Sequence, residues 1–164
     1  MRRLIVALVA ALALAGCSTH REGAVGDVLD GSTMHVKLLR FQQHSPVRHG
    51  SDVTGFSIPP AGKRFAGAEI VLCNDYGYST GPWQFTVALK GGGTDTAHLL
   101  YGTYPPSQQF EGGDDTGCTH GWLSFTVPKD ATVERLEYRF DDTGAYHRFG
   151  ASRDPEHDRF DWSV

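Results

Sequence analysis

Three cysteines have the most defined chemistry in this sequence of 164 residues, because a thiol can be acylated, oxidised or bound to a metal. Cys17 ends the run Leu14-Ala15-Gly16-Cys17, whose small residues suit a cleavage site. Two arginines and an apolar stretch over residues 4–14 come before it, so residues 1–16 have the parts of a secretory signal peptide. Eleven apolar residues cannot span a bilayer as a helix, which takes about 20. We therefore expect export, with cleavage before Cys17.

The run that ends at Cys17 resembles the lipobox of bacterial lipoproteins, in which the cysteine thiol receives a diacylglycerol and becomes the new N-terminus. The resemblance implies acyl chains of the palmitate type on Cys17, a membrane as partner, and a place on the extracytoplasmic side of the cell membrane. Two or three acyl chains make a durable anchor, whereas one chain of myristoyl size binds only marginally. The alternative is a plain signal peptide cut near Ala15, which leaves Cys17 an ordinary thiol.

Cys73 and Cys118 are the two cysteines that remain, and export places them in an oxidising compartment. An even pair in an exported domain predicts a disulfide between them, which would close a loop of about 45 residues. The alternative is two buried free thiols. A catalytic thiol is disfavoured because no neighbouring residue in the sequence is arranged to lower the pKa of either cysteine.

Length and charge limit the organisation of the exported chain. Removal of residues 1–16 leaves 148 residues, enough for one domain, which we expect over residues 26–164 behind a flexible tether at 17–25. It also leaves 13 basic against 19 acidic side chains, a formal charge of −6. This charge argues against nucleic acid or anionic lipid headgroups as the partner.

Apolar residues alternate with polar ones in several short segments separated by glycine and proline, which is the period of a half-buried strand. The predicted strands are residues 33–41, 64–73, 83–90, 96–101, 118–127, 132–140 and 145–149, with a phase slip near Arg135. The even-numbered side of 64–73 is the apolar one. No window holds a convincing helical stripe, so we predict an all-β fold, an antiparallel immunoglobulin-like β-sandwich of about seven strands. A closed barrel is the alternative.

Two segments resemble a domain family of unknown function that is common in Gram-positive lipoproteins. They are Gly62–Leu72 with Asn74, and Gly117–Pro128 followed by Leu136-Glu137-Tyr138. The resemblance covers roughly residues 25–140 and implies a telokin-like, immunoglobulin-type sandwich, similar to the secreted actinobacterial immunoprotective antigens. The family brings no catalytic residues, and its members are described as binding modules with unknown ligands.

Acidic residues and histidines are the candidate metal ligands of the sequence. The tetrads Asp114–Gly117 and Asp141–Gly144 repeat the order Asp-Asp-Thr-Gly, which suits an ordinary turn better than a calcium loop. Near the C-terminus, His147, Asp154, His157, Asp158 and Asp161 offer imidazole and carboxylate groups, but their spacing matches no ligand motif and residues 152–158 are typical of a solvated loop. We therefore expect no metal and no cofactor.

Aromatic residues in glycine-rich and proline-rich loops are the remaining candidates for a function. Tyrosine and tryptophan offer a large contact area at low entropy cost, so loop aromatics at one end of a sandwich can form a recognition patch. The candidates are Tyr76, Tyr78, Trp83, Tyr101, Tyr104 and, beside them, Phe110. The alternative is that these rings cover the ends of the sheets.

The sequence thus favours a module that binds a protein or an envelope component and catalyses no reaction. No serine nucleophile elbow, metal motif or pair of catalytic carboxylates is evident in the sequence. An envelope hydrolase or metal-binding protein is the first alternative. A passive structural or antigenic surface module is the second.

Overall fold

The structure is a computed structural model that describes residues 20–31, 34–45, 58–75, 77–97, 108–113, 115–140 and 158–164. Within these ranges it has nine strands and one short 3-10 helix, η1 (Pro82–Gln84). The strands are β1 (His20–Ala24), β2 (Val28–Asp30), β3 (Met34–Gln42), β4 (Lys63–Asn74), β5 (Phe85–Leu89), β6 (Thr94–Thr96), β7 (Gly117–Pro128), β8 (Val133–Arg139) and β9 (Arg159–Ser163).

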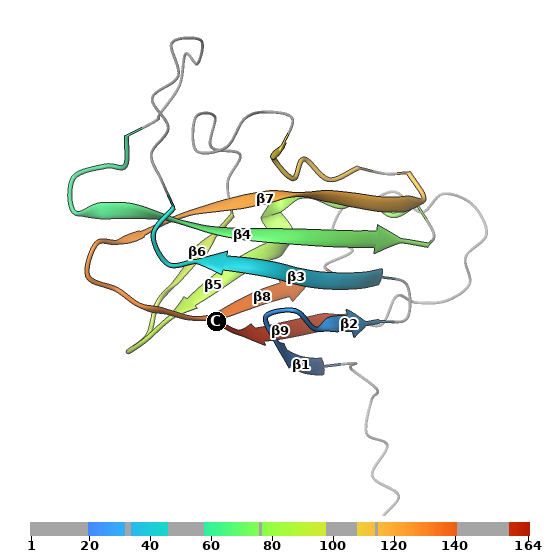
Figure 1. Cartoon of the computed structure of the whole chain (residues 1–164), viewed down its shortest axis with the longest axis horizontal. Helices are drawn as coiled ribbons and strands as arrows, with labels where there is room; N and C mark the ends of the chain where they lie inside the picture. Colours follow the sequence, from blue (N-terminus) through green and yellow to red (C-terminus); the bar gives the residue numbers. More distant parts are fainter. Residues whose placement is uncertain are drawn as a thin grey trace, which may run out of the picture.

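The strands form two sheets that pack face to face (Figure 1). One sheet has the order β1-β9-β8-β5-β6 and the other the order β2-β3-β4-β7. All neighbouring strands are antiparallel except β1 and β9, which pair in parallel with His20 opposite Arg159. The predicted β-sandwich is confirmed, and the described residues hold nine strands where about seven were predicted.

The core lies between the sheets and follows the alternation of the sequence. On β4 the even-numbered residues Ala66, Ala68, Ile70 and Leu72 are fully buried, as predicted. The other sheet contributes mainly aromatic rings, with Phe85 4.9 Å from Tyr138 and Tyr138 stacked at 5.6 Å on Phe160. Such ring pairs add to the hydrophobic gain of burial, so the core is more aromatic in one sheet than in the other.

The phase slip predicted near Arg135 is confirmed as a register irregularity between β5 and β8. Ala88 pairs with Arg135 and Leu89 pairs with Val133, so one extra residue is inserted on β8. Both Val133 and Leu136 can therefore face the core although they are three residues apart.

Both ends of the chain differ from the sequence-based prediction. The tether predicted over residues 17–25 is wrong for His20–Ala24, because these residues form β1 and are hydrogen-bonded to β9. Strand β9 was not predicted, and Asp158, placed in a solvated loop by its sequence, is buried. The strand predicted at 145–149 lies outside the described residues, as do residues 98–101 of another predicted strand.

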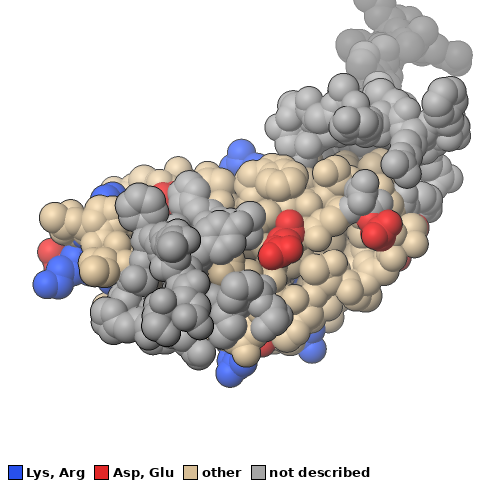
Figure 2. All heavy atoms as spheres, turned by 90° about the horizontal axis from the view of Figure 1, so that it is seen from above, with Lys and Arg blue, Asp and Glu red and all other residues tan. Residues whose placement is uncertain are grey.

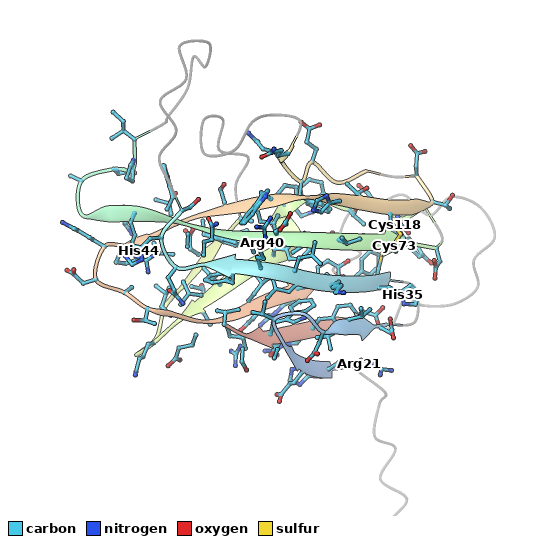
Figure 3. All side chains as sticks on the ribbon, in the orientation of Figure 1. Arg21, His35, Arg40, His44, Cys73 and Cys118 are labelled. Carbon is cyan, nitrogen blue, oxygen red and sulfur yellow. A yellow bond between two sulfur atoms is a disulfide. The ribbon has the colours of Figure 1, made fainter. Side chains whose placement is uncertain are left out.

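The predicted disulfide is present in the structure. Cys73 on β4 and Cys118 on β7 occupy directly opposite positions of the two neighbouring strands and are bonded through their sulfur atoms (Figure 3). The bond therefore links strands that the hydrogen-bond ladder already joins, and it closes a segment of 45 residues that contains η1, β5 and β6.

Candidate functional site

The predicted functional residues are only partly covered by the structure. Cys17, Tyr76, Tyr101 and Tyr104 lie outside the described residues, as does the signal peptide predicted at 1–16. Among the described residues, no helix has the length and apolarity that a membrane span requires.

The described loop aromatics differ in their surroundings. Tyr78 is half-buried and its ring meets Phe140 edge-on at 5.2 Å, while the side chain of Asn74 bonds both the N–H and the carbonyl oxygen of Tyr78. Trp83 is 61% exposed. Phe110, also considered a loop aromatic, is fully buried against Phe85, so it belongs to the core.

Gly81 fixes the position of the exposed ring of Trp83. A methyl group at residue 81 would lie 2.0 Å from the indole, so any larger residue would displace the ring. The indole is thus seated on bare backbone and remains open to solvent on its other side.

A set of charged residues on β1, β9 and β8 was not predicted; we call it the arginine face. It consists of His20, Glu22, Arg135, Glu137, Arg139, Arg159 and Asp161. The strand register places Glu22, Asp161 and Glu137 in one row and His20, Arg159 and Arg139 in the next. Like charges thus lie directly opposite each other in each row. Ion pairs between neighbouring rows offset the repulsion within each row.

Two buried carboxylates hold the arginines of this face. The side chain of Glu137 is 5% exposed and accepts hydrogen bonds from Arg135 at 2.6 and 3.0 Å and from Arg139 at 3.0 Å. Arg159 donates to Asp161 at 3.3 and 3.4 Å. The hydrogen bond to Glu137 raises the pKa of Arg135 further above its ordinary value. These contacts preorganise three guanidinium groups, each with N–H donors to spare.

His20, Glu22 and Asp161 could by geometry hold a metal ion, since their ligand atoms lie within 4.8 Å of one another. His20 Nε2 is 2.9 Å from Asp161 Oδ2. The same oxygen is 3.3 Å from Arg159 and 3.6 Å from Arg135, however. The positive charges of Arg159 and Arg135 beside this oxygen repel a metal cation. The electrostatics therefore favour an ion-pair network over a metal centre.

The outer face of the other sheet has a smaller cluster around Glu69. This nearly buried carboxylate accepts hydrogen bonds from Arg40 and from His120, the latter at 3.0 Å, and Arg40 stacks over Trp122 at 5.3 Å. The hydrogen bond from Arg40, more than the one from His120, lowers the pKa of Glu69 below its usual value. The cluster joins β3, β4 and β7 on the solvent side of their sheet.

Seen from above, most of the described atoms belong to uncharged residues, and acidic and basic side chains are scattered among them (Figure 2). The ion pairs given above lie on the outer faces of the two sheets.

His35 forms a separate pair of contacts, with ring nitrogens 2.8 Å from Asp30 and 2.8 Å from Asp75 (Figure 3). The hydrogen bonds to Asp30 and then to Asp75 raise the pKa of His35 above 6.5. Because the pKa of His35 is higher in the folded protein than in the unfolded chain, protonated His35 stabilises the fold fully at pH values below its unfolded pKa. This stabilisation is lost as the pH rises through the pKa of the folded protein.

We therefore expect the free energy of unfolding to fall modestly as the pH rises above about 6.5, the ordinary value for histidine. The effect is small because His35 is partly exposed. Urea denaturation at pH 5.5 and pH 8.5 measures it, and His35→Asn should reduce the difference. An unchanged difference in the His35→Asn protein would contradict the assignment.

The sequence contains a local signal of the arginine face. Arg135, Glu137 and Arg139 alternate with buried Leu136 and Tyr138, and Arg159 and Asp161 alternate with buried Phe160 and Trp162. The pattern indicates a charged outer face on each strand. The sequence does not show that β8, β9 and β1 are neighbours, so the network required the fold.

Comparison with known proteins identifies the N-terminal segment. Residues 1–18 match the family described as prokaryotic membrane lipoprotein lipid attachment site. This site implies a lipid-anchored, membrane-associated protein. A search of the curated proteins finds no match to the sequence.

Solved structures with the same fold include exported proteins. The yjhA protein from Bacillus subtilis aligns with a TM-score of 0.58 at 13% identity, over 86% of this chain and 98% of that one. The secreted protein MPT63 from Mycobacterium tuberculosis aligns with a TM-score of 0.55 at 12% identity, over 88% and 97%. A putative lipoprotein, ycdA, from Bacillus subtilis subsp. subtilis str. 168 aligns with a TM-score of 0.50 at 14% identity.

The alignment with ycdA covers 83% of this chain and 38% of the length of ycdA. At these identities the comparisons establish the β-sandwich fold. They do not transfer a ligand or an activity.

Proposed function

We propose that this lipoprotein is a non-catalytic binding module held on the extracytoplasmic side of the membrane, with the immunoglobulin-type sandwich of the immunoprotective antigens. The lipid attachment site and the fold shared with secreted proteins support export. The bonded pair Cys73–Cys118 supports it as well, since disulfides persist mainly outside the reducing cytosol.

The observation that carries the binding role is the arginine face. Its guanidinium groups are oriented by buried carboxylates and remain open to solvent, with the side chain of Arg139 61% exposed. Such groups recognise carboxylates through paired hydrogen bonds. The formal charge of −6 on the exported chain disfavours long polyanions, so the proposed ligand is a short acidic segment of a protein or an envelope component.

The test uses the lipidated protein in nanodiscs of neutral lipid, titrated with a hexaglutamate peptide and with hexaglutamine of the same length. Backbone amide signals of β8 and β9 should shift with hexaglutamate and stay in place with hexaglutamine. Arg139→Gln should weaken the interaction by about fivefold, because an exposed ion pair contributes up to about 1 kcal/mol.

Lys129→Gln is the matched control, since it removes the same charge from an exposed residue beyond the end of β7. It should leave the affinity nearly unchanged. Equal shifts with both peptides, or equal losses in the two variants, would contradict the proposed ligand class.

A further inference from the structure

The distance between the lipid-bearing cysteine and the folded domain is very short. Three residue steps separate Cys17 from His20, and a fully extended chain covers at most about 3.6 Å per residue, hence about 11 Å here. His20 is held in the sheet by the pairing of β1 with β9 and by its contact with Asp161. The edge of the sandwich where β1 begins therefore stays close to the bilayer.

Strand register shows which other segments lie at this end. His20 is opposite Arg159 and Arg159 is opposite Arg139, so these three form a row across β1, β9 and β8. On the next strand Phe85 is opposite Tyr138, so η1, which precedes Phe85, leaves the sheet at the same end. Strands are spaced about 4.8 Å apart, which places η1 roughly 14 Å from β1 along this end. Figure 3 shows Arg21 and His35 toward this end and His44 at the opposite one.

The exposed tryptophan is part of η1. The three tryptophans of the chain differ sharply in exposure, with Trp83 61% exposed, Trp122 8% and Trp162 fully buried. An exposed indole is costly in water and favourable at the boundary between lipid headgroups and acyl chains, where one side is apolar and the other wet.

We propose that the end of the sandwich where β1 begins lies against the bilayer and that Trp83 contacts the lipid headgroup layer. The short connection to Cys17 brings this end to the membrane. Gly81 keeps the indole available, because it seats the ring without covering its outer side. The opposite end, with the turns after β5 and β7, then points away from the membrane.

This inference rests on the lipid anchor of the proposed function, so the experiment reads both in one sample. The lipidated protein is mixed with vesicles of phosphatidylcholine brominated on its acyl chains near the headgroups, and with ordinary vesicles. Sedimentation reports anchoring, and tryptophan emission reports contact with the brominated lipid. We expect cosedimentation, with quenching of roughly one tryptophan's share of the emission.

Trp83→Phe should cosediment equally and lose the quenching, whereas Trp122→Phe should cosediment and keep it. A 12-residue Gly-Ser insertion between Thr19 and His20 should reduce the quenching, because the lengthened tether lets this end leave the surface. Failure to cosediment would contradict the anchor itself. Cosedimentation without quenching, or equal quenching in Trp83→Phe and wild-type protein, would overturn the proposed orientation alone.

Discussion

The Cys17→Ala protein is expected to leave the membrane fraction almost completely. Cys17 is the cysteine within the lipid attachment site matched at residues 1–18, and each buried CH2 of an acyl chain contributes roughly 0.8 kcal/mol to membrane binding. The described residues contain no helix able to cross a membrane. Cell fractionation followed by immunoblotting of the membrane and soluble fractions measures the change.

Ser18→Ala is the matched control, because it changes the adjacent residue and leaves the thiol in place. It should remain with the membrane. The fold of the Cys17→Ala protein should be unchanged, since residue 17 precedes β1. If the Cys17→Ala protein still sediments with membranes, lipid attachment at this residue is wrong.

The central strands could be predicted from sequence because local pattern and burial agree there. In β3, Met34, Val36 and Leu38 are fully buried and alternate with more exposed residues. In β4 and β7 the apolar face of each strand packs into the core as expected. A half-buried strand needs only this period of two, so its sequence contains most of the information.

The edge strand β1 could not be predicted in this way. Its sequence, His-Arg-Glu-Gly-Ala, has no apolar alternation, and the strand is stabilised by a partner some 140 positions away. The hydrogen bonds to β9 and the contact of His20 with Asp161 supply what the local sequence lacks. Tertiary pairing of this kind overrides local propensity.

The candidate site likewise contains features that could be predicted from the sequence and features that required the fold. The count of cysteines was enough to predict the disulfide, because export leaves an even pair with few other fates. The arginine face depends on the strand order β1-β9-β8, which joins the two ends of the chain. Phe110 lies in the core and not in an exposed loop because Gly121 allows its backbone to approach β7 closely, with a methyl group at 121 lying 2.5 Å from the Phe110 nitrogen.

Removal of the disulfide by the double change Cys73→Ala and Cys118→Ala is expected to lower the free energy of unfolding by about 4 kcal/mol. The reason lies mainly in the unfolded chain, where the link restricts a loop of 45 residues. Single domains are stable by about 5 to 15 kcal/mol, so the loss would be a large part of the total. Chemical denaturation of the purified lipoprotein in detergent, oxidised and double-variant forms side by side, measures it.

The matched control is Lys63→Ala with Pro128→Ala, a pair that is directly opposite on the same two strands but has no covalent link. Both positions are at least partly exposed, so the control should cost much less than the disulfide variant. Wild-type protein treated with a reductant should match the double cysteine variant, because both lack the same constraint. A double cysteine variant no less stable than the control pair would show that the hydrogen-bond ladder between β4 and β7 alone holds this part of the fold.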